Sequence, residues 1–188
     1  MPERDAVVPT RRLDLTVMSP GLMRALLAAD WGQAGRLLGA GIPAEWRGEY
    51  WQWLGQRPDQ AEADPSVVPW LPRVLLLRGT GERPGVVGEA GFHGPPDAAG
   101  RVEIGYMVLA AHRRRGYAEE AARGLMSWAS AEHGITLFRA SISPGNTASL
   151  NLIHKLGFTL MGRQHHEQRG EELVFHRDKP AAAGPDTD

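Results

Sequence analysis

The stretch HRRRGYAEEAA, residues 112–122, joins three arginines to a glycine and an alanine-rich run. A glycine lets the backbone approach a ligand closely, and the first N–H groups of a helix have no partner inside the helix. Such a helix start binds anions, and arginine side chains add positive charge around it. The stretch therefore indicates a phosphate-binding loop, made of Arg113, Arg114, Arg115, Gly116, Tyr117 and Ala118.

The spacing distinguishes this loop from two common phosphate-binding motifs. A P-loop needs Lys and Ser or Thr after its second glycine, and the dinucleotide fingerprint needs Gly-x-Gly-x-x-Gly after a first strand; neither is present. A nucleic-acid patch is also disfavoured, because 21 Lys and Arg against 22 Asp and Glu give a formal net charge of -1. Nucleic-acid-binding domains usually carry a basic excess.

Composition excludes several other classes of site. Cysteine is absent, so disulfides, thiolate metal sites and covalent catalysis by cysteine are excluded. His165 and His166 fall on opposite faces of an expected strand, so we expect no metal site. The N-terminal segment lacks the apolar run of a secretion signal, and the longest apolar runs are too short to cross a membrane. We expect a soluble, cytoplasmic protein that contacts neither membranes nor nucleic acid.

Hydrophobic periodicity predicts the elements that position the loop. Alternating apolar residues indicate strands, and apolar residues at helical spacing indicate helices. Strands are expected over 11–19, 73–79, 85–94, 101–110 and 136–143, helices over 20–41, 49–60, 116–133 and 146–157, and a hairpin over 158–178.

The order of these elements predicts a single α+β (mixed α/β) domain. We expect a mostly antiparallel sheet of about seven strands, flanked by about four helices. The domain is expected to span 9–179, with flexible ends at 1–8 and 180–188. The segment 42–72 holds four of the six tryptophans, and these either pack as a satellite cluster or line a substrate cleft: Trp46, Trp51, Trp53 and Trp70.

In this setting, the pattern Arg113-x-x-Gly116-x-Ala118 resembles the acetyl-CoA pyrophosphate loop of the GCN5-related N-acetyltransferase (GNAT) superfamily, Gln/Arg-x-x-Gly-x-Gly/Ala. The strand VEIGYMV before the loop and the segment ISPGNTASLNLIHKLGF (142–158) after it match the order of elements in that family. The resemblance covers residues 10–178. It is closest to the branch that includes ribosomal-protein N-terminal Ala/Ser acetyltransferases.

The resemblance implies a GNAT-like fold and transfer of an acetyl group from acetyl-CoA to a primary amine. The acceptor is either a protein N-terminus or a small molecule, and the protein is a monomer or a homodimer. Because cysteine is absent, direct attack of the amine on the thioester is expected. The resemblance also implies that free backbone groups of Met107 and Val108 hold the pantetheine arm and thioester. The Val108 N–H is then the candidate oxyanion donor, and Asn146 contacts the pantetheine.

Three positions depart from the family pattern. Ala110 replaces a common proline and Arg114 replaces a frequent glycine, and neither change prevents phosphate binding by backbone amides. Ile153 stands where many members carry a tyrosine that acts as an acid. The missing tyrosine leaves an alternative open, in which the chain is a non-catalytic module that binds or senses CoA or acetyl-CoA.

The candidates for proton transfer stand near the loop in the predicted fold. Glu103 is the leading candidate for the general base, Glu89 is a second, and a water chain is a third; Glu103 can equally be an ion-pair partner. Ser149 matches a serine of the ribosomal-protein branch and is the candidate acid, or else a capping hydroxyl. Tyr106 is a further candidate acid, and His93 could line the acceptor cleft.

Overall fold

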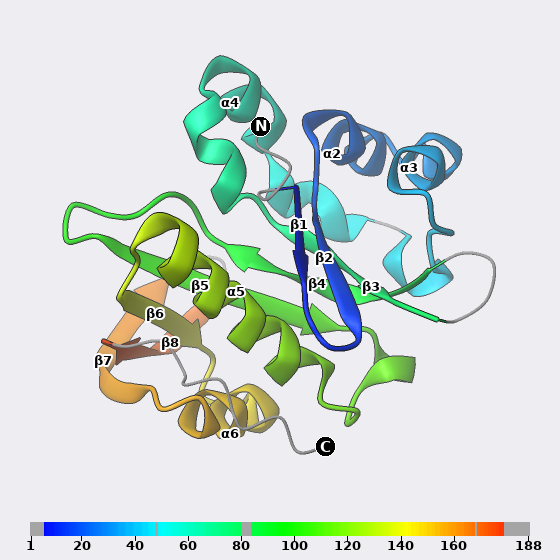
Figure 1. The fold of residues 1–188 in the computed structure, drawn as a ribbon. Coiled ribbons are helices and arrows are strands. Elements are labelled where there is room, and N and C mark those ends of the chain that lie inside the picture. The colour runs from blue at the N-terminus through cyan, green and yellow to red at the C-terminus, as the bar shows by residue number, and fades with distance from the viewer. Residues whose placement is uncertain (1–5, 48, 80–83, 168, 179–188) are drawn as a thin grey trace.

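The computed structural model describes residues 6–47, 49–79, 84–167 and 169–178 (Figure 1). Within this part of the chain, eight strands form one sheet in the order β1-β2-β3-β4-β5-β6-β8-β7. Neighbouring strands are antiparallel except β5 and β6, which are parallel. The predicted single α+β domain with a mostly antiparallel sheet is therefore confirmed. The strands are β1 (Val7–Pro9), β2 (Leu13–Val17), β3 (Arg73–Leu77), β4 (Gly85–Phe92), β5 (Arg101–Val108), β6 (Leu137–Ile142), β7 (Thr159–His166) and β8 (Gly170–Arg177).

Strand β1 lies in the segment that the sequence assigns to a flexible N-terminus. Val7 and Val8 pair with β2, and Val8 is only 4% exposed. The ladder to β2 and the burial of Val8 therefore extend the sheet to Val7, two residues before the expected start of the domain. A three-residue strand is too short to show alternation in the sequence. Residues 1–5 and the predicted tail at 180–188 lie outside the described residues.

The helix expected over 20–41 is two helices, separated by a turn. Ala29 has a φ of 55°, which an α-helix does not contain. The Asp30 carboxylate then accepts a hydrogen bond from the Gln33 N–H at 2.9 Å and begins the second helix. The α-helices of the described residues are α2 (Pro20–Leu27), α3 (Trp31–Leu38), α4 (Arg57–Ala63), α5 (Tyr117–His133) and α6 (Thr147–Lys155), with short 3-10 segments at η1 (Ala44–Trp46), η2 (Glu49–Leu54), η3 (Pro65–Trp70) and η4 (Ala110–His112).

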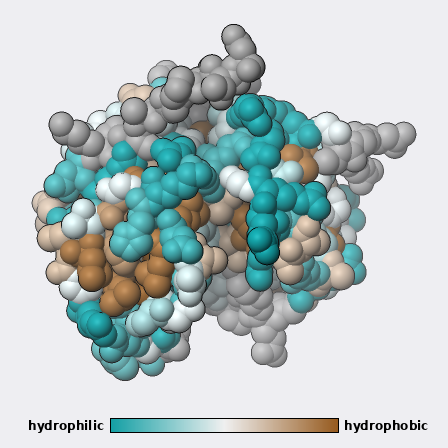
Figure 2. Space-filling view, turned by 90° about the horizontal axis from the view of Figure 1, so that it is seen from below, coloured by the Kyte–Doolittle hydropathy of each residue, from teal (hydrophilic) through white to brown (hydrophobic). Residues whose placement is uncertain are grey.

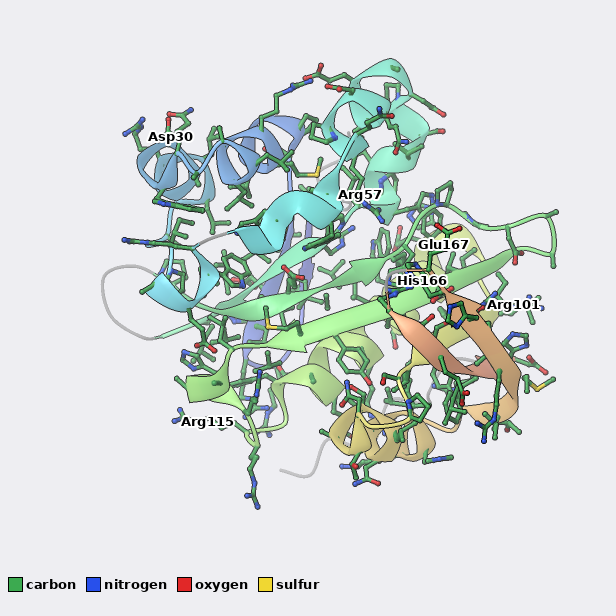
Figure 3. The ribbon with its side chains drawn as sticks, turned by 180° about the vertical axis from the view of Figure 1, so that it is seen from behind. Asp30, Arg57, Arg101, Arg115, His166 and Glu167 are labelled. Atoms are coloured by element: carbon green, nitrogen blue, oxygen red, sulfur yellow. The ribbon has the colours of Figure 1, made fainter. Side chains whose placement is uncertain are left out.

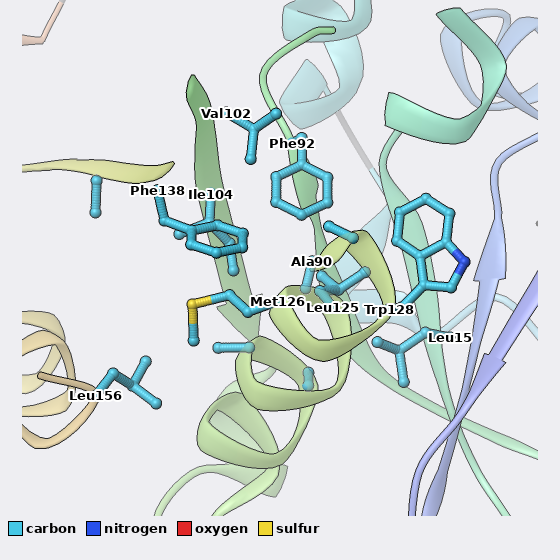
Figure 4. Close-up of a cluster of buried hydrophobic side chains, with 14 of the residues drawn as sticks. Leu15, Ala90, Phe92, Val102, Ile104, Leu125, Met126, Trp128, Phe138 and Leu156 are labelled. Atoms are coloured by element: carbon cyan, nitrogen blue, oxygen red, sulfur yellow. The ribbon is translucent and has the colours of Figure 1, made fainter. Parts of the chain in front are cut away.

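Helices cover both faces of the sheet (Figure 1). One hydrophobic cluster joins the sheet to α5 and α6, and we name this side the α6 face. The other cluster joins the sheet to α2, α3 and α4, and we name this side the α4 face. On the α6 face, Leu125 and Met126 of α5 are buried against Phe92, Ile104 and Phe138 of three strands (Figure 4). This packing fixes α5 on the sheet beside the strand that precedes it.

Strand β7 is one edge of the sheet. Leu160 and Met161 of β7 are 50% and 60% exposed. Seen from below, hydrophobic residues gather on the side where α6 and the β7–β8 hairpin lie (Figure 2). Exposed edge strands are general sites of association between chains. This edge therefore allows a homodimer without requiring one, and both predicted states, monomer and homodimer, stay open. Among the described residues, we find no helix long and apolar enough to span a bilayer.

Candidate functional site

The sheet opens between β5 and β6. The parallel ladder between them runs from Arg101 to Glu103, and its last pair is Glu103 with Arg139. Strand β5 continues to Val108 while it stays paired with β4 on its other side. From Ile104 to Val108, one edge of β5 therefore has no strand partner among the described residues.

The β4–β5 ladder determines which backbone groups face this opening. The His93 N–H donates to the Glu103 carbonyl at 2.8 Å, and the Leu109 N–H donates to the Val87 carbonyl at 3.0 Å. In an antiparallel ladder, residues that bond to the partner strand alternate with residues whose N–H and C=O point the other way. Every second residue of β5, Met107 included, therefore bonds to β4.

The residues between them, Tyr106 and Val108, turn their backbone groups toward the opening. The Val108 carbonyl accepts a hydrogen bond from Nε of Arg113 at 3.0 Å. The Val108 N–H points into the opening, where the proposed oxyanion donor is needed. Met107, whose backbone is expected to hold the pantetheine arm with Val108, lines the cavity, but its backbone groups face β4 and its side chain packs against the core of the α4 face.

A cavity of about 770 Å³ follows the opening and reaches both faces of the sheet. This volume lies in the range of small-molecule sites. Arg57 of α4 and His166 of β7 both line the cavity, and Figure 3 shows them beside the same end of the sheet. The cavity is lined on the α6 face by Tyr106, Asn146 and Ser149, on the α4 face by Trp53, Arg57, Glu89 and His93, and at the hairpin by His166, Arg169 and Glu172.

The predicted phosphate-binding loop follows the end of β5. Gly116 has a φ of 80° and is the N-cap of α5, with no side chain capping the helix. In the described part of the chain, the N–H groups of Arg114, Arg115 and Gly116 donate to no backbone carbonyl. The first N–H groups of α5 are unpaired within the helix as well. The loop therefore presents consecutive backbone donors at the positive end of the helix dipole.

The three arginines of the loop have different surroundings. Arg113 is turned back toward β5 by its bond to Val108. Arg114 has a φ of 60°, a left-handed conformation that is uncommon outside glycine. Arg114 and Arg115 are exposed, and Figure 3 shows Arg115 extending away from the ribbon.

A fourth arginine, Arg12, reaches the loop from the β1–β2 turn. Its guanidinium lies 4.6 Å from the centre of the Tyr117 ring, and one of its nitrogens is 3.4 Å from the place of a Cβ on Gly116. Glu120 of α5 holds Arg12 by accepting from its backbone N–H at 2.6 Å and pairing with Nε at 2.7 Å. Burial raises the pKa of Glu120, but hydrogen bonds from Thr10 and Arg12 outweigh it and lower the pKa. Sequence analysis missed Arg12 because only the fold brings it to Gly116.

The start of α6 borders the cavity opposite β5. The Asn146 side chain accepts a hydrogen bond from the Ser149 N–H at 3.1 Å, so Asn146 is the N-cap of α6. The Tyr106 hydroxyl lies 3.5 Å from the Ser149 carbonyl, to which it donates. Burial raises the pKa of Tyr106 to about 12, and the contact with Ser149 opposes this only in part. Tyr106 therefore keeps its proton at neutral pH, and its hydroxyl donates a hydrogen bond to the Ser149 carbonyl at the wall of the cavity.

Glu103 is an ion-pair partner on the α4 face. Its Oε1 lies 3.4 Å from Nδ1 of His93, and its Oε2 lies 3.2 Å from Nε of Arg139. Burial raises the pKa of Glu103, but the hydrogen bond and charge of His93, the hydrogen bond of Ser141 and the charge of Arg139 together lower it to about 2. This geometry supports the ion-pair interpretation. Glu89, the second candidate base, is 7% exposed and lines the same cavity.

The tryptophans of the segment 42–72 have two different roles. Some pack as a buried cluster, and one lines the cavity. Trp46, Trp51 and Trp70 are buried, and the rings of Trp46 and Trp51 meet edge to face at 4.8 Å. Trp53 is 40% exposed and lines the cavity, with the Arg57 guanidinium 5.5 Å from its ring centre. Three of the tryptophans are thus packing residues, and one belongs to the cavity wall.

The chain matches the model of one known protein family. A family model described as an acetyltransferase (GNAT) domain matches residues 19–159. Over 75 residues, the chain is 40% identical to a Bacillus subtilis (strain 168) protein named uncharacterized N-acetyltransferase YjdG. This match covers 40% of the chain and 45% of the relative, so the chain spans less than half the length of that curated protein.

Solved structures share the fold. The ribosomal-protein-S5-alanine acetyltransferase from Vibrio fischeri is 12% identical with a TM-score of 0.62, over 95% of this chain and 99% of that one. The microcin C7 self immunity acetyltransferase MccE, in complex with acetyl-CoA and AMP, is 16% identical with a TM-score of 0.61, over 89% of this chain and 93% of that one. At these identities the likeness concerns the arrangement of the elements.

Proposed function

The chain belongs to the GNAT family of acetyltransferase domains, and we propose that it is an N-acetyltransferase that moves an acetyl group from acetyl-CoA directly to a primary amine. The observation that carries the proposal is the opening between β5 and β6. It leaves backbone groups of β5 without a strand partner, the cavity lies along it, and the chain continues from the end of β5 to the loop at the start of α5. An extended thioester substrate with a diphosphate needs such a path.

The residues along the path fit the parts of acetyl-CoA in order. The amides of the loop from Arg113 to Ala118, with Arg12 beside them, suit the diphosphate. The backbone of Tyr106 and Val108 faces the opening and suits the amide groups of the pantetheine arm. Asn146 lines the same cavity. The Val108 N–H is the donor for negative charge that develops on the thioester oxygen.

The chemistry requires the amine to lose a proton before it attacks. The C–N bond then forms at the thioester carbon, the C–S bond breaks, and sulfur leaves with the electron pair. Tyr106 turns its hydroxyl from the Ser149 carbonyl to donate a hydrogen bond to the departing sulfur, and it keeps its own proton, since a thiol is a stronger acid than a phenol whose pKa is about 12. Ser149 lines the cavity beside it and is the second candidate donor.

The acceptor is either a protein N-terminal amine or a small-molecule amine. The α4 face of the cavity carries side chains of both signs, including Glu89 and Arg57, so it does not select one class by charge. The rest of the proposal keeps the expectations from the sequence: a cytoplasmic monomer or homodimer that acts without nucleic acid, membrane or metal.

The test has two stages. Calorimetry is expected to show binding of acetyl-CoA to the purified protein. A thiol-release assay with peptides that begin with Ala or Ser, polyamines and aminoglycosides is then expected to show acceptor-dependent turnover with at least one amine. Binding without acceptor-dependent release for every amine would support the alternative, a non-catalytic module that binds or senses CoA or acetyl-CoA.

A further inference from the structure

His93 lies where β4 ends, and its main chain extends the β4–β5 ladder by one bond. Its N–H donates to the Glu103 carbonyl at 2.8 Å. This bond brings the two side chains to the same face, because residues opposite each other in an antiparallel ladder share a face. The result is a contact of 3.4 Å between Nδ1 of His93 and Oε1 of Glu103. The imidazole is thus oriented by a carboxylate through one of its two nitrogens.

The other nitrogen, Nε2, lies over β5. A Cβ at Gly105 would be 2.7 Å from Nε2 of His93. The imidazole therefore occupies the space that any other residue at position 105 would fill. Both His93 and Gly105 line the cavity, and the His93 side chain is 40% exposed. Nδ1 faces Glu103, and Nε2 lies beside Gly105, which lines the cavity with His93.

Glu103 is held in turn from the next strand. Arg139 of β6 is its register partner and contacts its second oxygen at 3.2 Å. Arg139 also contacts Gln164 of β7, and Gln164 donates to Glu172 of β8 at 2.9 Å. The carboxylate that faces His93 is therefore part of a chain of contacts across four strands, which restricts its movement.

Two groups in this pair could accept the proton of the amine, and their proton affinities differ. The carboxylate of Glu103 has a pKa of about 2. That value includes the charge of His93, which is neutral when it acts as the base; even at the ordinary value of 4.5, moving a proton to Glu103 from an α-ammonium group with a pKa of about 8 is uphill by about three units or more. Histidine is the side chain that ordinarily exchanges protons near neutral pH. This difference in pKa disfavours Glu103 as the direct acceptor of the amine proton.

We propose that His93 is the general base of the reaction and that Glu103 is the positioning residue that orients its imidazole. This inference rests on the proposed acetyl transfer. Neutral His93 takes one proton from R–NH₃⁺ at Nε2, directly or through one water. The amine then forms the C–N bond as the C–S bond breaks. The second proton on that nitrogen passes to the thiolate, and His93 returns its proton to solvent.

Other charged groups face the same cavity and enter any pH dependence. Arg57 of α4 donates to the His93 carbonyl at 3.3 Å. The groups that line the cavity with it are Glu89 of β4, His166 of β7, Arg169 before the last strand and Glu172 of β8. Because these groups stay in place when His93 alone is changed, a variant of His93 isolates its contribution.

The test compares His93→Gln with His165→Gln, a control on the exposed part of β7. Using an acceptor that wild type acetylates, we expect kcat/KM to fall about 100-fold or more in His93→Gln, with acetyl-CoA affinity unchanged. The acidic limb of wild type is expected to be replaced by one at higher pH, where the rate rises only as the amine itself loses its proton, near pH 8 for an α-amine. Unchanged acetyl-CoA affinity shows that the variant is folded.

Glu103→Gln separates the two roles. As a positioning residue, Glu103 orients the imidazole, so Glu103→Gln is expected to keep the acidic limb of the pH profile and to lower kcat/KM about 10-fold. The opposite result would overturn the proposal. If Glu103→Gln lost the acidic limb of the wild-type pH profile and His93→Gln kept it, Glu103 would be the base. Wild type without acceptor-dependent turnover would overturn the proposed function and this inference together.

Discussion

The two parts of the candidate site, the phosphate-binding loop and the His93–Glu103 pair, are built in different ways. The phosphate-binding loop is six consecutive residues, Arg113 to Ala118, and its donors are backbone N–H groups at the start of α5. The His93–Glu103 pair comes from two strands and is held by Arg139 of a third. The loop thus depends on a backbone conformation, and the His93–Glu103 pair depends on side chains that three strands bring together.

This difference predicts different responses to mutation. At the loop, exposed side chains such as Arg115 can change with little loss, while a change that alters the backbone near Gly116 removes binding. At the pair, the backbone is a regular ladder, and the positions of the side chains carry the activity. Acetyl-CoA affinity therefore reports on the loop, and the rate of turnover reports on the pair.

The largest expected effect on acetyl-CoA binding is at Gly116. Gly116→Asp places a side chain at a φ of 80° and a negative charge among the loop amides. The Kd for acetyl-CoA is expected to rise about 100-fold, which corresponds to about 2.7 kcal/mol. Calorimetry measures the affinity, and circular dichroism checks that the fold persists.

Arg115→Ala is the matched control, because it changes a neighbouring exposed side chain and leaves the backbone as it is. Its Kd is expected to stay within about 3-fold of wild type, as exposed charges contribute little. Equal losses in both variants would mean that side-chain charge, and not backbone geometry, holds the diphosphate.

The next effect in size is at Gly105, which lines the cavity beside His93. In Gly105→Ala, the new methyl group meets Nε2 of His93 at 2.7 Å and displaces the imidazole. We expect kcat/KM to fall by about 10- to 100-fold, because a shift of about 1 Å in a catalytic group has an effect of this size. The Kd for acetyl-CoA is expected to stay the same.

Gly162→Ala on β7 is the control, since among the described residues nothing lies within 4 Å of the place that its new methyl group would take. A Gly105→Ala enzyme as fast as wild type would show that the position of the imidazole over β5 has no part in the rate. The comparison of the two alanine variants separates this effect from a general cost of replacing glycine in a strand.

The fold could be predicted where each element has a long and regular pattern. The alanine stripe of α5 and the alternation of β5 are such patterns, and both elements are where the sequence places them. The three residues of β1 carry no periodicity, and their strand exists because β2 lies beside them. The break at Ala29 is missed by the sequence pattern because apolar spacing continues across it, and only the backbone angle shows the turn.

The candidate site could be predicted where its parts are adjacent in the chain. The loop around Gly116 has a spacing that can be recognised directly. The contact of His93 with Glu103, and of Arg12 with Gly116, depends on strand register, which no local pattern specifies. One available signal is that β4 and β5 are neighbouring antiparallel strands, so a given turn length pairs His93 with Glu103.

The smallest effect concerns stability and tests how firmly Glu103 is held. Its pKa of about 2 in the folded protein is below its ordinary value of 4.5, so the unfolded chain takes up the proton first as the pH falls. The ion pairs of Glu103 therefore stabilise the protein above about pH 5, and this contribution is lost between about pH 5 and pH 2. Glu103→Gln lacks it at every pH.

At pH 7, Glu103→Gln is expected to lower the free energy of unfolding by about 1 kcal/mol, because solvent reaches part of the side chain and screens the pairs. Thermal melts should show a Tm lower by about 2–4 °C at pH 7, with the difference from wild type shrinking toward pH 3. Glu171→Gln, at an exposed carboxylate of β8, serves as the control. A difference that stays constant with pH would mean that Glu103 contributes by packing, and that His93 is oriented by shape instead of charge.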